Sequence, residues 1–216
     1  MGSVPLRVNE IFHSIQGESS HAGRPCVFVR LTGCNLRCVW CDTAYAFHEG
    51  QTLTIDDVIE RVRSYGCRLV EVTGGEPLLQ PDAIPLLARL LDAGFEVLLE
   101  TGGSLSIRDV PRGVKRIVDV KCPASGEAQR NRWDNLDDLR EGDELKFVLA
   151  GRADYDWAVR EMRERALGDR APILFSPVHG AVDGADLARW VLDDGLAVRV
   201  QVQLHKVLWP SAQRGV

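Results

Sequence analysis

The sequence predicts an α/β protein built on a partial (β/α)6-type barrel. Short apolar segments alternate along the chain with segments in which apolar residues recur every three or four positions. This alternation is typical of a parallel sheet covered by helices. About six or seven such units are present, fewer than the eight of a closed barrel. The alternative is a doubly wound open sheet.

Seven strands are predicted from apolar runs bounded by turn residues. They cover residues 26–32, 69–73, 95–100, 116–121, 144–150, 172–176 and 196–203. In both sheet arrangements ligands bind at the carboxyl ends of the strands. The segments that follow these strands are therefore the expected place for a binding site.

Four helices are predicted between the strands, over residues 54–65, 81–93, 154–167 and 184–194. The first begins at a potential capping box, with Thr54 as N-cap and Asp57 three residues later. Gly94 and Gly195 are placed to end the second and the fourth. No repeat, low-complexity tract or long linker interrupts the pattern, so we expect one domain over residues 1–216.

Composition excludes several classes of protein. The net charge is −5 and the pI about 5.6, so no basic field favours nucleic acid or an anionic membrane. No apolar run approaches the roughly 20 residues of a membrane span, and the N-terminus lacks an apolar signal region. We therefore expect a cytoplasmic protein without nucleic-acid or membrane partners.

Three cysteines gather in the loop of residues 33–48, directly after the first predicted strand. Cys34, Cys38 and Cys41 have the spacing C-x3-C-x2-C. Clustered cytoplasmic cysteines more often bind metal than form disulfides. A four-iron cluster held by three thiolates keeps one iron open to a ligand. A zinc site would need a fourth ligand, which His48 could supply, and cysteines that bind nothing are a third possibility.

The remaining cysteines have separate interpretations. Cys26 lies within an apolar strand and Cys67 just before one, so both are interpreted as small core residues. Cys122 lies at a strand end, where either a structural or a ligand-facing position is open.

The cysteine loop, with Trp40 before its last cysteine, resembles the cluster motif of radical S-adenosylmethionine enzymes. TGGEPL, at residues 73–78, follows the next predicted strand and resembles the GGE segment of that superfamily. Glycines allow backbone groups to approach a ligand closely. The two motifs together imply a radical S-adenosylmethionine core.

The resemblance extends along the chain to the 7-carboxy-7-deazaguanine synthase family. The similar segments are IFHSIQGESSHAGRPCVFVRLTGCNLRCVWCDT, TGGEP, ETGG, VDVKCP, LKFV, SPVHG and QLHKVLWP. Two features depart from the family pattern: Ser19 stands where glycine is common, and SAQRGV follows Pro210 where some relatives stop.

This resemblance implies a carbon–nitrogen lyase that contracts 6-carboxy-5,6,7,8-tetrahydropterin to 7-carboxy-7-deazaguanine with loss of ammonia. The pathway is 7-deazapurine and queuosine biosynthesis, which supplies tRNA modification precursors. The implied cofactors are a [4Fe-4S] cluster, S-adenosylmethionine and Mg²⁺. A 5′-deoxyadenosyl radical would remove hydrogen from the pterin C6. An electron donor such as flavodoxin and a homodimer are also implied.

The resemblance assigns the cofactor side of the site by position. Cys34, Cys38 and Cys41 hold the cluster, and Thr43 holds magnesium. S-adenosylmethionine is assigned to Trp40, Asp42, Gly74, Gly75, Glu76, Glu100, Lys121, Cys122, Pro123, Ser176, Pro177, Val178 and His179. A loop role without a ligand remains open for the residues from Lys121 onward, and a turn-capping role remains open for Thr43.

The substrate side is assigned to Ile15, Gln16, Gly17, Glu18, Arg30, Thr73 and His205, and Lys206 could also meet the substrate. Arg30 is informative because it interrupts an apolar strand. A buried arginine is costly unless paired, and a substrate carboxylate is a suitable bidentate partner. An internal ion pair is the alternative.

Two rival functions remain at this level. One is a radical S-adenosylmethionine activase that installs a glycyl radical on a partner protein. The other is a non-catalytic binding module stapled by zinc.

Overall fold

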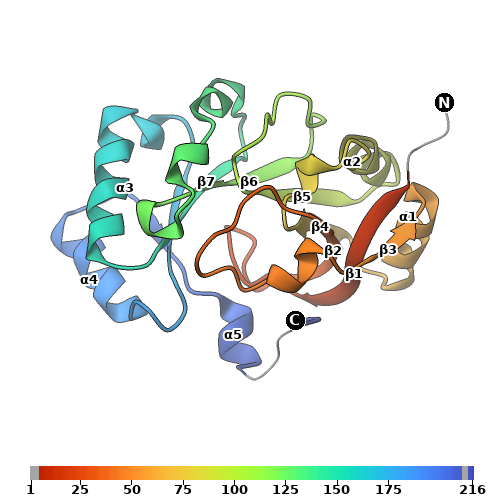
Figure 1. The fold of residues 1–216 in the computed structure, drawn as a ribbon, viewed down its shortest axis with the longest axis horizontal. Coiled ribbons are helices and arrows are strands. Elements are labelled where there is room, and N and C mark those ends of the chain that lie inside the picture. The colour runs from red at the N-terminus through yellow and green to blue at the C-terminus, as the bar shows by residue number, and fades with distance from the viewer. Residues whose placement is uncertain (1–4, 211–213) are drawn as a thin grey trace.

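The computed structural model of the chain describes residues 5–210 and 214–216 and contains a nine-stranded sheet (Figure 1). The strands are β1 (Leu6–Ile15), β2 (Pro25–Leu31), β3 (Gln51–Leu53), β4 (Leu69–Gly74), β5 (Glu96–Thr101), β6 (Lys115–Val120), β7 (Glu144–Leu149), β8 (Ile173–Pro177) and β9 (Arg199–Val200). Their order is β3-β1-β2-β4-β5-β6-β7-β8-β9. β1 pairs antiparallel with β2 and β3, and all other pairs are parallel. Because β3 and β9 form the edges, the sheet stays open, which confirms the predicted partial barrel.

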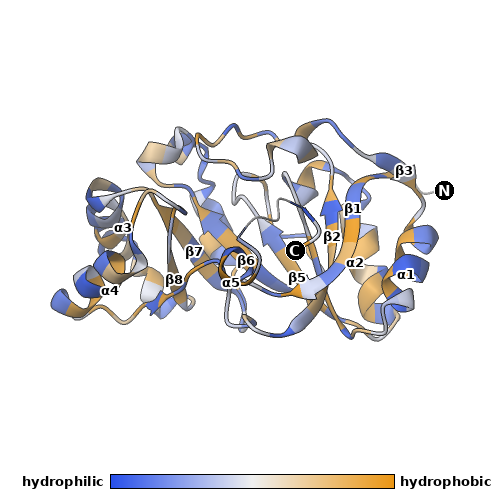
Figure 2. Cartoon of the chain, turned by 90° about the horizontal axis from the view of Figure 1, so that it is seen from below, coloured by the Kyte–Doolittle hydropathy of each residue, from blue (hydrophilic) through white to orange (hydrophobic). Residues whose placement is uncertain are grey.

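The four long helices cover one face of this sheet. They are α1 (Ile55–Ser64), α2 (Ala83–Asp92), α3 (Arg152–Glu164) and α4 (Gly184–Asp193). All four contribute to one large apolar cluster with the outward side chains of the strands. The smaller cluster on the other face contains no residue of these helices within the described chain. In Figure 2 the apolar sides of α1 and α2 are directed toward the sheet. The doubly wound alternative, which needs helices on both faces, is therefore wrong.

The inner face of the sheet changes from apolar to polar along β2, β4, β5, β6 and β8. Side chains alternate between the two faces with a period of two. On β4, Val70 and Val72 join the helix-covered core, while Leu69, Glu71 and Thr73 point the other way. The equivalent inner pairs are Phe28 and Arg30, Leu98 and Glu100, Ile117 and Asp119, and Leu174 and Ser176. The apolar members contribute to a small layer, and the polar members face a cavity above it.

The helix boundaries follow the predicted capping residues, with one exception. Thr54 Oγ1 accepts from Asp57 N at 3.1 Å, and the Asp57 carboxylate accepts from Thr54 N at 3.0 Å. Gly94 and Gly195 follow α2 and α4 with φ of 86° and 59°. The helix predicted over residues 154–167 instead covers Arg152–Glu164. Ala166 adopts a left-handed conformation with φ of 49°, which ends the helical path.

Other differences lie near the two ends of the sheet. β1 and β3 are absent from the prediction, because β1 is rich in polar residues and β3 has only three. The strand predicted over residues 196–203 is wrong except at Arg199–Val200. Beyond it the chain approaches the N-terminal segment, where Gln201 Oε1 accepts from Ser19 N at 2.8 Å. The short helix α5 (Leu204–Leu208) follows.

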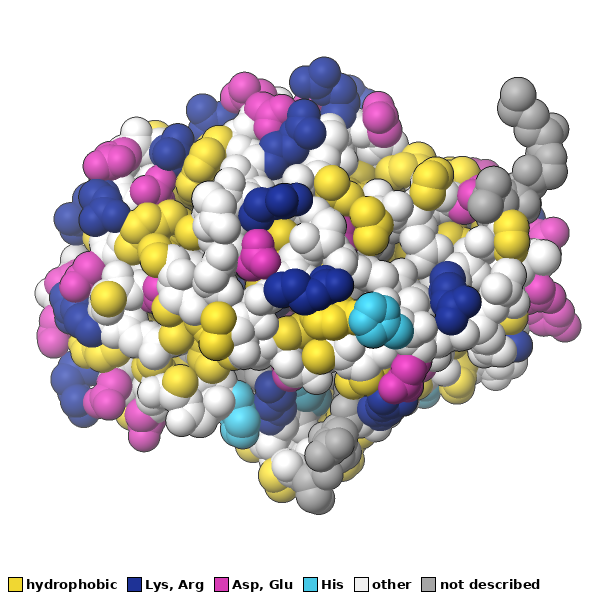
Figure 3. All heavy atoms as spheres, viewed as in Figure 1, with side chains coloured by type: hydrophobic (Ala, Val, Ile, Leu, Met, Phe, Trp, Pro, Cys, Tyr) yellow, Lys and Arg dark blue, Asp and Glu magenta, His cyan; other side chains and the backbone are white. Residues whose placement is uncertain are grey.

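Two surface properties complete the description. On the face seen in Figure 3, basic and acidic side chains are interspersed rather than gathered in a patch of one sign. Within residues 5–210 and 214–216, no helix combines the length and apolar character needed to cross a bilayer.

Candidate active site

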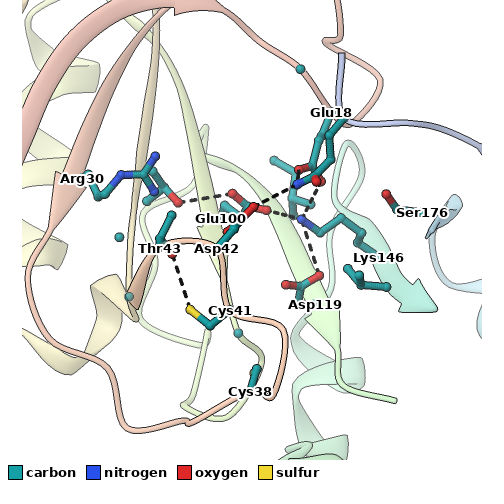
Figure 4. Close-up of a pocket in the computed structure, with 18 of the residues that line it drawn as sticks. Glu18, Arg30, Cys38, Cys41, Asp42, Thr43, Glu100, Asp119, Lys146 and Ser176 are labelled. Carbon is teal, nitrogen blue, oxygen red and sulfur yellow. Dashed lines mark hydrogen bonds and ion pairs between the residues drawn. The ribbon is translucent and has the colours of Figure 1, made fainter. Parts of the chain in front are cut away.

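A cavity of about 230 Å³ opens at the carboxyl ends of the parallel strands (Figure 4). Its walls come from the segment before β2, the cysteine loop, the strand ends and the start of α5. The predicted residues that line it are Ile15, Gln16, Gly17, Glu18, Arg30, Cys34, Cys38, Trp40, Cys41, Asp42, Thr43, Thr73, Gly74, Gly75, Glu100, Lys121, Ser176, Pro177, Val178 and His205. Most of the predicted cofactor and substrate residues therefore meet at one place.

The cysteine loop directs three thiols to this cavity. Cys34, Cys38 and Cys41 are free and partly buried. Burial raises the pKa of Cys34 and Cys38, while the positive charge of Lys121 acts to lower it. The nearby ammonium therefore offsets only part of the effect of burial on the thiolate form that binds iron.

Backbone contacts fix the path of the loop. Gly33 N donates to Ala46 O at 2.8 Å, which closes the loop on itself. Val39 N donates to Ser125 O at 3.1 Å, which ties the loop to the segment after β6. The thiols are thus carried on a loop anchored at both its base and its tip.

The donors fit an iron–sulfur cluster better than a zinc ion. His48 is exposed and does not line the cavity, so it does not complete the alternative Cys3His set. Among the described residues, no three His, Cys, Asp or Glu side chains converge to hold a metal ion. A four-iron cluster does not need such convergence, because each thiolate binds a different iron. The three thiols suit a cluster with one iron free of protein ligands.

Two glycines bring the end of β4 against the cysteine loop. A Cβ on Gly75 would lie 2.6 Å from the Cβ of Cys34 and would also clash with Gly33 O. A Cβ on Gly74 would clash with Leu31 O. Only glycine permits this backbone approach, so the motif places main-chain groups beside the cysteines.

The next residue of the motif, Glu76, points away from the cavity. Its side chain is fully buried and accepts from Leu78 N at 3.0 Å, Thr101 Oγ1 at 2.8 Å and Gly102 N at 2.7 Å. Burial raises the pKa of Glu76, and these donors act against that rise. The carboxylate joins the loops after β4 and β5 rather than facing a ligand.

A cluster of charged side chains lies at the cavity wall (Figure 4). Lys146 Nζ is 2.8 Å from Glu18 Oε2 and also bonds Glu100 Oε1. Lys121 Nζ is 2.7 Å from Asp119 Oδ2, and Asp119 Oδ1 is 3.6 Å from Lys146 Nζ. Because of these ion pairs, carboxylate acceptors and lysine ammonium groups lie side by side in the cavity.

Arg30 has both an internal partner and a free side. Its Nε donates to Glu10 Oε1 at 2.8 Å, and its guanidinium lies over the rings of Phe12 and Tyr45 at 5.8 and 6.0 Å. Within the described residues, its two terminal nitrogens have no hydrogen-bond acceptor. The internal ion pair is therefore present, yet it leaves two donors available to a carboxylate.

The segment before β2 is held in place by contacts with Glu71 of β4 and with His205 of α5. Gln16 Nε2 donates to the buried carboxyl of Glu71, and Gln16 Oε1 accepts from Glu18 N at 2.8 Å. Burial raises the pKa of Glu71 well above its usual value. A Cβ on Gly17 would clash with the ring of His205, and burial lowers the pKa of His205, so its imidazole is neutral at pH 7.

Residues from the two ends of the chain close one side of the cavity. Gln203 Nε2 donates to Glu18 Oε1 at 2.9 Å, and Lys206 Nζ is 2.8 Å from Asp42 Oδ2. Burial opposes the ionisation of Asp42, but Lys206 outweighs it and lowers the pKa of Asp42. Thr43, the next residue, lies with its Oγ1 3.7 Å from Cys41 Sγ.

Comparison with known proteins places the chain in a family. The Radical SAM superfamily model matches residues 28–123. The 7-carboxy-7-deazaguanine synthase of Koribacter versatilis (strain Ellin345) is 45% identical, covering 98% of this chain and 100% of the relative. The synthase of Chlorobaculum tepidum is 46% identical, covering 99% and 98%. This chain belongs to the 7-carboxy-7-deazaguanine synthase family. Membership implies a [4Fe-4S] cluster and S-adenosylmethionine as cofactors.

A solved structure has the same fold as this member of the 7-carboxy-7-deazaguanine synthase family. The crystal structure of QueE from Escherichia coli matches with a TM-score of 0.74 at 24% identity. The match covers 93% of this chain and 95% of that one. The cysteine loop and the glycine segment lie within the part matched by the superfamily model.

Some residues that the 7-carboxy-7-deazaguanine synthase resemblance assigned to S-adenosylmethionine do not line the cavity. They are Glu76, Cys122, Pro123 and His179. Cys122 is 1% exposed and packs in the helix-covered core. In the stretch after Pro210, residues 211–213 lie outside the described residues, while Val216 lines the cavity.

Other lining residues are missing from the predicted set. They are Ser19, Glu71, Asp119, Lys146 and Gln203, with several smaller or apolar neighbours, whereas Lys206, a further substrate candidate, does line the cavity. A signal existed for three of them, since Glu71, Asp119 and Lys146 are charged residues within predicted apolar strands, as Arg30 is. Glu100, assigned to the ribose, accepts from Thr73 Oγ1 at 3.2 Å and so lies among residues assigned to the substrate.

Proposed function

We propose that this chain converts 6-carboxy-5,6,7,8-tetrahydropterin to 7-carboxy-7-deazaguanine with loss of ammonia. The observation that carries the proposal is one cavity with two chemically different sides. Arg30 offers two donors on one side, and Glu18 offers a carboxylate acceptor on the other. The substrate likewise has a carboxylate at one end and amino and ring N–H groups at the other. Close relatives over the full chain carry this synthase name.

The protein's own part in the reaction is to bind, orient and exclude water. The cluster and S-adenosylmethionine, when bound, supply the radical chemistry that removes hydrogen from the substrate. Gly74 and Gly75 offer close-lying backbone to the cofactor. Arg30 fixes the carboxylate end of the pterin, while Glu18 fixes its aminopyrimidine end, with the neutral His205 beside Gly17 on the Glu18 side.

Magnesium, the electron donor and the quaternary structure belong to the same proposal. We infer a Mg²⁺ ion between Thr43 and the substrate carboxylate, because magnesium prefers oxygen ligands and retains several waters. An electron donor such as flavodoxin and a homodimer are inferred from the family resemblance.

The proposal is tested with protein purified and reconstituted under anaerobic conditions. We expect a brown protein that releases ammonia and forms 7-carboxy-7-deazaguanine from the pterin when given a reductant and S-adenosylmethionine. A colourless zinc protein would support the binding module instead. A brown protein without pterin turnover would support an activase or another radical reaction.

Replacing Arg30 with lysine is expected to weaken pterin binding by about 10- to 100-fold, since hydrogen bonds to charged groups contribute about 1.5–3 kcal/mol. Lysine keeps the charge but loses the planar donor fork. Affinity for S-adenosylmethionine should change little. Calorimetric titration of both ligands measures the difference. Unchanged pterin affinity with a lower melting temperature would make Arg30 solely the partner of Glu10.

Replacing Thr43 with alanine is expected to remove most of the Mg²⁺ stimulation of turnover. Iron content and S-adenosylmethionine binding should remain, because Thr43 Oγ1 approaches only the Cys41 thiol within the described residues. The measurement is initial rate against Mg²⁺ concentration. A variant as active and as responsive to Mg²⁺ as the parent would remove Thr43 from the site.

A further inference from the structure

Lys146 is a buried cation shared by three carboxylates. It lies within β7 and is 3% exposed. A buried ammonium costs several kcal/mol unless its partners compensate. Its Nζ is 2.8 Å from Glu18 Oε2, bonds Glu100 Oε1 and is 3.6 Å from Asp119 Oδ1. These partners come from the segment before β2, from β5 and from β6, so one ammonium joins three separate parts of the wall.

Two of these carboxylates are fixed at both oxygens. Glu18 Oε1 accepts from Gln203 Nε2 at 2.9 Å, and Glu100 Oε2 accepts from Thr73 Oγ1 at 3.2 Å. An ionised carboxylate has about four lone-pair sites, so each still has acceptor capacity. Both residues line the cavity. Together they form an acceptor wall whose orientation depends on Lys146.

The charges of the carboxylates and ammonium groups around Lys146 do not cancel. The three carboxylates around Lys146 face one further ammonium, that of Lys121, which is 2.7 Å from Asp119 Oδ2. Burial raises the pKa of Glu71 on the same wall well above its usual value, which opposes a further negative charge there. Asp119 Oδ1 has no hydrogen-bond partner among the described residues. Three negative charges against two positive ones favour a ligand rich in N–H donors.

We propose that Lys146 is a positioning residue that holds the carboxyl groups of Glu18 and Glu100 oriented to receive the N–H donors of the pterin's aminopyrimidine edge. The inference rests on the proposed function. It also moves Glu100 from the ribose to the substrate, because the neighbours of Glu100 are substrate-side residues. A cluster of ion pairs that only stabilises the fold is the competing explanation.

The test compares Lys146→Met and Lys115→Met in the reconstituted holoenzyme. Lys115 lies at the opposite end of its strand, 3.4 Å from Glu96, and does not line the cavity. We expect Lys146→Met to raise the Kd for the pterin about 100-fold, because two charged acceptors lose their orientation. Affinity for S-adenosylmethionine should change less than about threefold, and Lys115→Met should leave both affinities unchanged.

The two affinities separate positioning from stability. A purely structural role of Lys146 would lower the melting temperature of Lys146→Met and weaken the binding of both ligands together. A positioning role weakens pterin binding while S-adenosylmethionine binding persists, because Lys146 bonds Glu18 and Glu100 on the substrate side.

Several outcomes would overturn this inference. They are unchanged pterin affinity in Lys146→Met, or an equal loss of affinity for the pterin and for S-adenosylmethionine. If Lys146→Met does not fold, Lys146→Arg keeps the charge but presents a planar fork; about tenfold weaker pterin binding supports positioning, and parental affinity overturns it. A parent enzyme that does not bind the pterin would instead refute the proposed function.

Discussion

Replacing Cys34, Cys38 or Cys41 singly with alanine is expected to remove most of the iron and to abolish turnover. On the proposed assignment each of these thiols, all of which line the cavity, supplies one of three protein ligands, and two thiolates would not retain a four-iron cluster. The measurements are iron and sulfide per chain, the visible absorption of the reconstituted protein and the rate of pterin conversion. Full activity in any of the three variants would contradict the cluster assignment.

Two other cysteines provide matched controls for this experiment. Cys26 is fully buried in the small apolar layer below the cavity. Burial strongly raises the pKa of its thiol, so it stays protonated. Cys67 lies before β4, with its Sγ 3.3 Å from Pro25 O. Cys26→Ala and Cys67→Ala should both retain iron and turnover, which would show that loss of a thiol alone is not the cause.

Replacing Asp143 with alanine is expected to lower the free energy of unfolding by about 3–5 kcal/mol, the usual cost of leaving a buried charge unpaired. Arg116 is 0% exposed, and its Nε and Nη2 both bond the Asp143 carboxylate. That carboxylate also accepts from Arg116 N at 3.0 Å and Arg140 N at 2.7 Å. The substitution therefore leaves the Arg116 guanidinium without its carboxylate and the backbone N–H groups of Arg116 and Arg140 without an acceptor. Denaturant unfolding, followed by circular dichroism, measures the loss.

Asp156→Ala is the control for this second experiment. Asp156 pairs with Arg152 at 2.8 Å on the exposed side of α3. Exposed pairs of this spacing contribute about 0.3–0.5 kcal/mol, so stability should hardly change. A loss below about 1 kcal/mol in Asp143→Ala would indicate that water can replace the carboxylate around Arg116.

The sequence alone was sufficient to bring together the residues that lie within one contiguous motif. Cys34, Cys38 and Cys41 lie in one loop, so their proximity follows from chain connectivity alone. The glycines of the TGGEPL segment could be placed beside them because parallel strands present their carboxyl ends at one edge. In contrast, the direction of a side chain within a motif depends on its contacts. Glu76 belongs to the motif but turns toward Thr101 and Gly102.

Side chains on a strand point alternately to its two faces, and this alternation explains most of the remaining differences between the predicted and the observed site residues. Cys122 continues the outward series of Val118 and Val120, and all three lie in the helix-covered core. Lys146 and Asp119 have the opposite parity and face the cavity. Counting alternate residues along each predicted strand would have separated these groups. The contacts of Gln203 and Lys206 could not be obtained in this way, because they depend on a segment predicted as a strand.

The links of Gln203 to Glu18 and of Lys206 to Asp42 join residues 185 and 164 positions apart. Protein synthesis proceeds from the N-terminus, so the cysteine loop is made long before the segment that covers it. Contacts of such long sequence separation also form late, because they close large loops. One wall of the cavity is therefore completed last during biogenesis. Until then, the thiols remain open to the delivery of iron and sulfide.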